Sequence, residues 1–183
     1  MSTPLPTSEA DARLFDTGDE LPHLTDCLWL ILDGVVKSYT LNESGSFITL
    51  GFWGSEDLVG HSSSIAPYNL QCLSTVKAIA VHRDGWNNFS KNLLNYALQT
   101  QQLSYIVRNN RIARRLWLLL EWLANKFGRT VEQGRSIDFK LTHQELADAI
   151  GTTRITVTKT LIQFEREGSI LRPKTRSIIL TGN

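Results

Sequence analysis

Cysteine and histidine are scarce in this sequence of 183 residues, which has two cysteines and four histidines. Two cysteines are too few for a disulfide framework or for an iron–sulfur cluster held by four thiolates. Neither Cys27 nor Cys72 belongs to a C-x-x-C pair. We therefore interpret both cysteines as small buried residues of the core.

The scarcity of histidine bears on one class of enzyme. A β-barrel metal enzyme of the cupin type needs clustered ligands, usually two closely spaced histidines and a carboxylate, around an open metal position. The first half of the chain has only His23, His61 and His82, which lie far apart in the sequence. The sequence therefore predicts no metal, no cofactor and no catalytic residue, and a cupin-type enzyme is the least favoured function.

Long apolar runs are also missing. No stretch reaches the roughly 18 consecutive apolar residues that a membrane-spanning helix needs. Residues 1–13 are polar and lack the apolar centre of a signal peptide. We expect a cytoplasmic protein without membrane contact, whose 42% of hydrophobic residues suffice for a core in one or two domains.

The net charge of +1 conceals two halves of opposite sign. Residues 1–83 contain ten acidic and four basic residues, whereas residues 84–183 contain eight acidic and fifteen basic ones. Net charges of −6 and +7 indicate that only the second half faces a polyanion such as a nucleic acid. Chance segregation of solvated surface charges is the alternative.

Residues 13–83 have the pattern of short strands. Runs such as Leu28–Leu32 and Phe47–Leu50 are separated by turn-forming segments such as Asp33-Gly34. The turns recur at roughly the 8–12-residue spacing of an all-β structure. The pattern therefore predicts a β-barrel or β-roll.

A helical pattern replaces the strands between Asn92 and Phe127, where there is neither proline nor glycine. The first helix, from about Lys91 to Val107, has a narrow apolar stripe with a period of about 3.5 residues, which favours a symmetric contact between two chains. Packing on its own domain is the alternative. The predicted dimer seam consists of Leu93, Tyr96, Thr100, Leu103 and Val107.

A second helix, Ile112 to Phe127, has a wider apolar face, which is typical of a helix packed inside a domain. We expect Gly128 to end it as a C-cap glycine. Arg129 to Arg135 is interpreted as a linker, and the alternating segment Ser136 to Leu141 as a short strand.

The next segment predicts two helices joined by a tight turn. Thr142 and Glu145 have the spacing of a capping box that begins the first helix. Gly151 would end this helix, and Thr153 is a good N-cap for a second one that runs to about Glu167. Such a pair is a helix-turn-helix, with a shared core that we assign to Leu146, Ala147, Ile150, Val157 and Leu161.

The second helix of this pair has an outward face suited to the major groove of DNA. Apolar contact with thymine methyl groups and arginine contact with guanine would distinguish base pairs, and hydroxyl groups would bind phosphates. A helical hairpin of a protein-interaction module that binds no DNA is the alternative. The predicted base-contacting residues are Arg154, Ile155, Thr158 and Lys159, with Ile162 on the same face and Thr160 as a further phosphate donor.

Two short apolar runs follow, Ser169 to Arg172 and Ser177 to Leu180, joined by the basic segment Pro173 to Arg176. This pattern predicts a β-hairpin wing whose tip lies on a backbone phosphate. The predicted backbone-contacting residues are therefore Thr142, Thr153, Thr156, Lys174 and Arg176.

The motifs together resemble the family of cyclic-AMP receptor protein and fumarate–nitrate reduction regulators over essentially the whole chain. Leu28–Lys37, Glu43–Ser46 and Gly54–Gly60 resemble the sensor motifs of the family, and Leu141–Leu171 resembles its winged helix-turn-helix. Thr152–Lys159 is most similar to the recognition helix of the cyanobacterial global nitrogen regulators.

This resemblance implies an α+β fold in three parts. A double-stranded β-roll of the cyclic-nucleotide-binding type would occupy residues 1–90, a dimerisation helix residues 91–111, and a winged helix-turn-helix residues 112–183. The implied function is that of a transcription regulator, a homodimer on palindromic double-stranded DNA with RNA polymerase as a further partner. By similarity, Arg154 contacts guanine, Lys159 is a second basic contact, and Ile155 stands where the cyclic-AMP receptor has a base-contacting glutamate.

Three departures from the family pattern concern the dimer and the effector. The segment Trp86 to Leu116 is several residues shorter than the dimerisation helix of the family. Gly60-His61-Ser62 replaces the Gly-Glu-Leu stretch that binds ribose, and Pro67 to Cys72 has no Arg-Ser pair for a cyclic phosphate. A buried phosphate without a cationic partner costs several kcal/mol. We therefore expect that cyclic AMP does not activate this protein and that any effector is a different one.

Overall fold

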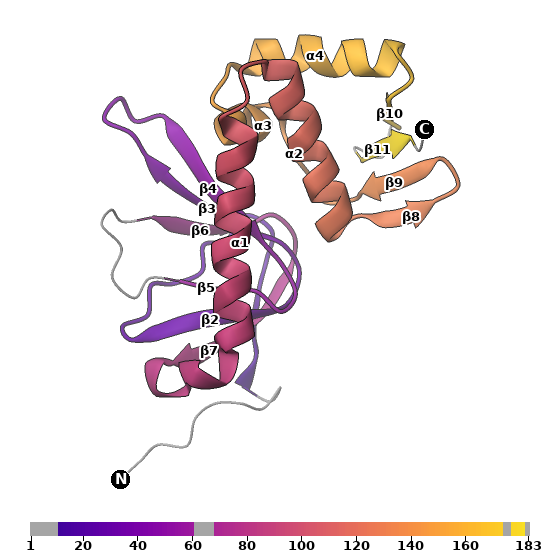
Figure 1. Ribbon diagram of the computed structural model, residues 1–183. Coiled ribbons are helices and arrows are strands. Elements are labelled where there is room, and N and C mark those ends of the chain that lie inside the picture. Colours follow the sequence, from indigo (N-terminus) through magenta and orange to yellow (C-terminus); the bar gives the residue numbers. More distant parts are fainter. Residues whose placement is uncertain (1–10, 61–67, 174–176, 182–183) are drawn as a thin grey trace. The chain divides into compact units, whose positions relative to one another are not determined.

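The computed structural model describes residues 11–60, 68–173 and 177–181 (Figure 1). The chain divides inside its longest helix into two compact units, the first ending at Gln101 and the second beginning at Gln102. The predicted boundaries at residues 90 and 111 stay a prediction. Among the described helices, none is long and apolar enough to span a membrane.

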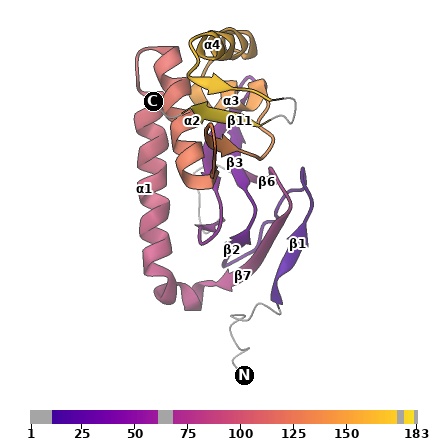
Figure 2. The ribbon, with the colours of Figure 1, turned by 90° about the vertical axis from the view of Figure 1, so that its right-hand side faces the viewer.

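The first unit contains two antiparallel sheets, with strand orders β1-β7-β2-β5 and β4-β3-β6. In Figure 2, β1, β7 and β2 lie side by side, as their pairing requires. The expected β-roll is confirmed by this pair of sheets. Their strands are β1 (Arg13–Phe15), β2 (Cys27–Asp33), β3 (Val36–Leu41), β4 (Phe47–Trp53), β5 (Leu58–Val59), β6 (Asn69–Cys72) and β7 (Val76–His82).

Large aromatic side chains fill the interior of this unit, and their indole N–H groups are hydrogen-bonded there. Trp29 and Trp53 are both 1% exposed. The Trp29 Nε1 donates to the Pro22 carbonyl at 3.0 Å, and the Trp53 Nε1 donates to Ser38 Oγ at 2.9 Å. Satisfied donors let indole rings be buried without an unpaired polar group.

The two cysteines differ in burial. Cys72 is buried in the core, as predicted, and burial raises the pKa of its thiol to about 12. Cys27 is only half-buried, so its assignment to the buried core is wrong. It is the first residue of β2 and pairs with His82, the last residue of β7, at the end of the sheet.

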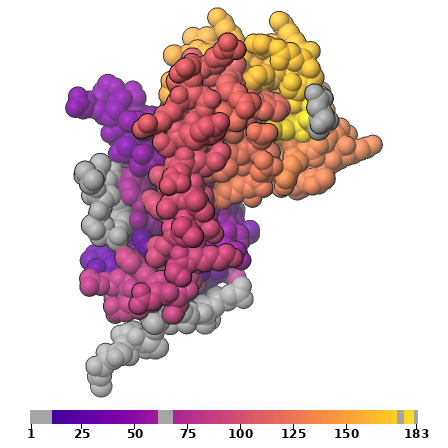
Figure 3. All heavy atoms as spheres, viewed as in Figure 1, coloured from indigo at the N-terminus to yellow at the C-terminus, as the bar shows by residue number. Residues whose placement is uncertain are grey.

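The hairpin of β3 and β4 projects from the first unit (Figures 1 and 3). The Asn42 side chain closes its turn by accepting backbone N–H bonds from Ser44 at 3.0 Å and from Ser46 at 2.8 Å. Leu41 and Phe47, paired across the tip, stay about half exposed. The tip therefore contributes little to the core.

A 3-10 helix (Arg83–Phe89) leads from β7 into α1 (Ser90–Val107). The beginning of α1 is attached to the sheets of the first unit. The Tyr96 ring stacks on Trp53 with 4.5 Å between ring centroids and an interplanar angle of 5°. Gln99 Nε2 donates to Asp57 Oδ1 at 2.5 Å, and Asn92 Nδ2 donates to the Glu56 carbonyl at 2.5 Å.

The second unit combines three helices with one antiparallel sheet of order β10-β11-β9-β8. Arg129 to Arg135 is not a linker, because it contains β8 and the turn into β9. The strand β9 pairs with β8 on one side and β11 on the other. The elements are α2 (Ile112–Phe127), β8 (Arg129–Val131), β9 (Gly134–Ile137), α3 (His143–Ile150), α4 (Arg154–Arg166), β10 (Ile170–Leu171) and β11 (Ile178–Thr181).

Two glycines end helices in this unit for different reasons. Gly151 has φ +67° and ψ 54° after α3, the left-handed conformation that favours glycine, as predicted. Gly128 is the C-cap of α2, as predicted, but its φ of −80° and ψ of 153° are not left-handed. A Cβ at Gly128 would lie 2.4 Å from the Ala124 carbonyl oxygen, so space rather than conformation requires glycine there.

Candidate nucleic-acid interface

The first helix of the predicted helix-turn-helix begins at a complete capping box. Thr142 Oγ1 accepts the backbone N–H of Glu145 at 3.1 Å, and Glu145 Oε2 accepts that of Thr142 at 2.7 Å. The Thr142 hydroxyl also donates to Glu145 Oε2 at 2.8 Å. The cap therefore already uses the hydroxyl proton of Thr142. This hydroxyl is then not a free donor for a phosphate.

The turn and the second helix also form as predicted. Thr153 caps α4 by accepting the backbone N–H of Thr156 at 3.2 Å. The predicted shared core of α3 and α4 is fully buried. Leu146, Ala147, Ile150, Val157 and Leu161 are each 0% exposed.

Arg115 on α2 holds the end of α3 in place. Its Nη1 donates to the Ile150 carbonyl at 3.1 Å, and its Nε donates to the Asn109 carbonyl at 2.5 Å. The last carbonyls of a helix have no partner within the helix. A cation at this end also interacts favourably with the helix dipole. Arg115 therefore fixes α3, and through it the turn into α4.

The outward face of α4 is apolar and basic. Ile155 is 68% exposed, Ile162 is 36% exposed, and Arg154 and Lys159 are exposed. The opposite face, with Val157 and Phe164, is buried. Isoleucine is unfavourable on a helix face that only water contacts. Two isoleucines on the outer face of α4 therefore indicate that a partner covers this surface.

The threonine hydroxyls of α4 are largely committed within the helix. Thr158 Oγ1 donates to the Arg154 carbonyl at 2.9 Å, and Thr160 Oγ1 donates to the Thr156 carbonyl at 2.9 Å. Thr160 is 9% exposed, so it is not available as the phosphate donor that we expected. Thr156 Oγ1 lies 2.9 Å from Thr153 Oγ1 and remains partly exposed.

His143 joins α3, α4 and the segment after β10. Its Nδ1 lies 2.7 Å from Thr158 Oγ1, and its Nε2 lies 3.5 Å from Arg172 Nη1. Arg172 in turn donates to Glu165 Oε2 from Nη2 at 2.6 Å and from Nε at 3.2 Å. Burial, and then the charges of Arg172 and Arg154, lower the pKa of His143 below its ordinary value.

A hollow of about 310 Å³ lies beside the start of α3 and is lined by Lys140, Thr142, His143 and Arg172, among others. Its basic and hydroxyl groups are of the kind that binds a backbone phosphate. Lys174 and Arg176, predicted to bind phosphates at the tip of the wing, lie outside the described residues.

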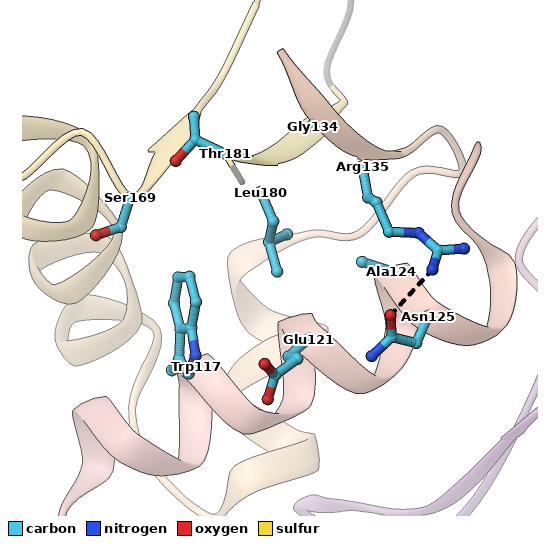
Figure 4. A pocket seen from close by; sticks show the side chains of 9 residues that line it. All are labelled: Trp117, Glu121, Ala124, Asn125, Gly134, Arg135, Ser169, Leu180 and Thr181. Carbon is cyan, nitrogen blue, oxygen red and sulfur yellow. Dashed lines mark hydrogen bonds between the residues drawn. The ribbon is translucent and has the colours of Figure 1, made fainter. Parts of the chain in front are cut away.

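A second hollow, of about 380 Å³, lies between α2 and the sheet (Figure 4). The Trp117 ring and Leu180 form its apolar wall, and Glu121 and Arg135 lie at its polar side. Arg135 Nη1 donates to Asn125 Oδ1 at 3.1 Å. The Trp117 ring also meets the edge of Phe164, on the inner face of α4. This hollow therefore lies behind α4.

The predicted dimer seam on α1 is only partly at the surface of a single chain. Tyr96 stacks on Trp53, and Leu103 is 5% exposed. Leu93 of the seam is 38% exposed, and Thr100 is exposed. Three other apolar residues of α1 are more exposed, namely Leu94 at 61%, Leu98 at 52% and Tyr105 at 58%.

The sensor motifs are described only in part. His61 and Pro67, which belong to the two departures in the sensor motifs, lie outside the described residues. Arg83 pairs with Asp26 Oδ1 at 3.2 Å, both side chains being about half exposed or more. Lys37 is 6% exposed, with its Nζ 5.4 Å from the centre of the Tyr39 ring. No group of three or more metal-ligating side chains occurs within ranges 11–60, 68–173 and 177–181.

Sequence reasoning missed Arg115, His143 and Arg172. No periodicity marks them, because each acts across elements. Arg115 bonds a carbonyl 35 residues away, and Arg172 lies 29 residues from His143 in the sequence. Their residue types, two cations and an imidazole in a basic half of the chain, were the only available signal.

Known proteins share these features with this chain. Residues 110–181 match the family model described as the Crp-like helix-turn-helix domain. The regulatory protein CysR of Synechococcus elongatus is 35% identical over 164 residues, which are 87% of this chain and 79% of that protein. The global nitrogen regulator of Synechocystis is 27% identical over 182 residues, covering 90% of this chain and 79% of that protein.

A solved structure has the same fold. A transcriptional regulator of the CRP family from Thermus thermophilus superposes with a TM-score of 0.79 at 20% identity, covering 93% of this chain and 92% of that one. The transcriptional regulator SdrP, also from Thermus thermophilus, is 30% identical in sequence over 173 residues, 85% of this chain and 83% of its own length.

Proposed function

The chain belongs to the Crp/Fnr family of DNA-binding transcription regulators, and we propose that it acts as a homodimer that inserts α4 of each protomer into the major groove of a palindromic site. Two recognition helices then lie about one DNA turn, roughly 34 Å, apart. Arg154, Ile155, Thr158 and Lys159 contact base edges. Thr142, Thr153, Thr156, Lys174 and Arg176 contact the backbone.

One observation carries this assignment of contacts. Ile155 is an apolar residue 68% exposed between Arg154, which is exposed, and the partly exposed Thr156. Apolar contact with a thymine methyl group, next to an arginine that bonds guanine O6 and N7, is a combination that distinguishes base pairs in the major groove. The position of Ile155 on the outer face of α4 supports this role.

Arg154→Ala tests the base contact. We expect the variant to lose about 1–3 kcal/mol of binding free energy on the site that the wild-type protein selects from random duplexes. The preference for one guanine should also be relaxed. Binding sites selected from random duplexes, and affinities by fluorescence anisotropy over a salt series, measure both effects. Arg176→Ala is the matched control, because loss of a proposed phosphate contact weakens all sequences about equally. An equal loss on selected and random DNA for Arg154→Ala would remove it from the base-contacting set.

The dimer forms through α1 in this proposal. Leu94, Leu98 and Tyr105 repeat at intervals of four and seven residues, the spacing of one face of a helix. Their exposure supports a contact surface next to the predicted seam, whose Tyr96 and Leu103 are engaged or buried in one chain. The dimer contact would therefore lie on the face of α1 that carries Leu94, Leu98 and Tyr105, next to the predicted seam.

Cyclic AMP is not the effector in this proposal. The strand β6 contains no basic residue, and Arg83 is paired with Asp26 at the surface. Calorimetry with cyclic AMP and cyclic GMP, together with anisotropy on the selected site, tests this. We expect no micromolar binding and less than a tenfold gain in DNA affinity. If a nucleotide does bind, Lys37→Met shows whether the buried Lys37 supplies the cation that β6 lacks.

The proposal also includes RNA polymerase as a partner and a cytoplasmic location, as the work of a transcription regulator requires. It assigns no catalytic activity. We expect RNA polymerase to copurify on promoter DNA with the wild-type protein. It should not copurify with a variant that cannot bind DNA.

A further inference from the structure

Four side chains link three elements of the second unit. In order they are Glu165 on α4, Arg172 after β10, His143 at the start of α3, and Thr158 on α4. We name this set the His143 relay. It ends at the Arg154 carbonyl, to which Thr158 Oγ1 donates at 2.9 Å.

The contacts of the relay fix the proton positions on His143. A threonine hydroxyl has a single proton, and Thr158 gives its proton to the Arg154 carbonyl. With the proton placed there, His143 Nδ1 donates the bond of 2.7 Å to Thr158 Oγ1, and the contact of the opposite ring nitrogen supports this direction. Arg172 can only donate, so His143 Nε2, 3.5 Å from Arg172 Nη1, accepts. Both contacts require the neutral imidazole with its proton on Nδ1.

The charges around His143 favour the same neutral form. Arg172 approaches from the segment after β10, Arg154 lies on α4, and Lys140 lines the same hollow. Each carboxylate on these elements has another partner: Glu165 is bonded to Arg172, Glu145 is bonded into the capping box, and Asp148 accepts from Gln144 Nε2. Burial and the two arginines lower the pKa of His143, which keeps its ring neutral near pH 7.

These bonds determine what Thr158 can do on the outer face of α4. Its proton and one lone pair of its oxygen are used, which leaves one lone pair. In the major groove, adenine N6 and cytosine N4 are the amino groups that donate to such an acceptor. Guanine presents only the acceptors O6 and N7 there. Thr158 in this state can therefore accept a bond from adenine or cytosine and gains none from guanine.

We propose that His143 is a positioning residue for sequence recognition, which holds the Thr158 hydroxyl as an acceptor and so selects an amino-bearing base at the position that Thr158 meets. This inference rests on the proposed insertion of α4 into the major groove. Without His143, the Arg154 carbonyl is the one remaining partner of the hydroxyl in this set, so the hydroxyl can exchange that bond for one donated to guanine. The base preference at that position then falls, while the preference set by Arg154 remains.

The experiment measures base preference at each position with the full-length protein. Wild type, His143→Ala, His143→Asn, Thr158→Val and the His143→Ala/Thr158→Val double variant each select sites from random duplexes. Anisotropy then gives Kd for the four base pairs at the Thr158 position. We expect wild type to prefer an amino-bearing base about fivefold, which corresponds to about 1 kcal/mol, the lower end of the range for a specific base contact.

His143→Ala is expected to reduce this preference to about twofold and to leave the guanine preference of Arg154 unchanged. His143→Asn restores it, because the asparagine amide offers a donor near the position of Nδ1. Thr158→Val removes the preference, and His143→Ala then adds nothing. A uniform loss at all positions, or an unchanged preference in His143→Ala, overturns the inference. Failure of wild type to select any site would instead refute the proposed function.

Nitrogen-15 NMR of the imidazole in the free wild-type protein tests the relay without any variant. The expected signal at pH 7 is that of the neutral ring with its proton on Nδ1. A ring protonated on Nε2 overturns the inference, whatever the DNA-binding result.

Discussion

Ile155 gives the sharpest test of how α4 meets DNA. Truncation to alanine removes three carbon atoms, and each buried methylene contributes about 0.8 kcal/mol. Because the side chain is 68% exposed in the free protein, about two-thirds of this gain, ~1.6 kcal/mol, remains for the DNA contact. We therefore expect Ile155→Ala to raise Kd for the selected site by about 15-fold.

The same substitution should change the stability of the free protein little. The buried third of the side chain contributes about 0.8 kcal/mol, and alanine regains about 0.4 kcal/mol through its helix propensity. Urea unfolding monitored by circular dichroism is expected to show a net change below about 0.5 kcal/mol. A large loss of stability would mean that Ile155 supports the fold rather than the contact.

Anisotropy with the selected and a random duplex is the assay for binding, and Leu14→Ala is the control. Leu14 is 74% exposed on β1, so it matches Ile155 in exposure but lies in the other unit. Leu14→Ala should leave Kd unchanged. If Ile155→Ala binds the selected site within twofold of wild type, or loses equally on both duplexes, thymine contact by Ile155 is refuted.

Two further predictions concern the dimer and the fold. Leu98→Glu should yield monomers in analytical ultracentrifugation and lower the thermal midpoint only by the lost stabilisation of the dimer, because Leu98 is 52% exposed, whereas Leu103→Glu also buries a charge and lowers the midpoint further. Dimers that persist in Leu98→Glu at micromolar concentration would place the contact elsewhere. Gly128→Ala should cost about 1–3 kcal/mol from crowding against the Ala124 carbonyl. Gly151→Ala, with nothing closer than 4.0 Å, should cost about 1 kcal/mol from its positive φ alone; equal costs would contradict this distinction.

The helix-turn-helix was predictable because its determinants are local. A capping box spans four residues, a left-handed turn needs one glycine, and the buried face of each helix repeats every three or four residues. Thr142, Glu145, Gly151 and Thr153 therefore have in the structure the helix-capping roles that the sequence predicts.

Features that depend on distant partners were not predictable in this way. The strand β8 has no alternating apolar pattern and exists because β9 pairs with both β8 and β11. The stripe on α1 predicts a helix with an apolar face but not what covers that face. For Tyr96 it is Trp53 of the same chain.

The contacts of α1 with the first unit limit how an effector can act. Tyr96, Gln99 and Asn92 attach the helix to the sheets through one aromatic stack and two hydrogen bonds. A stacked aromatic pair contributes about 0.5–1.5 kcal/mol beyond its buried area, and a ligand shifts an equilibrium only by its differential affinity for two states. An effector that moves α1 must therefore offset the Trp53–Tyr96 stack and both hydrogen bonds.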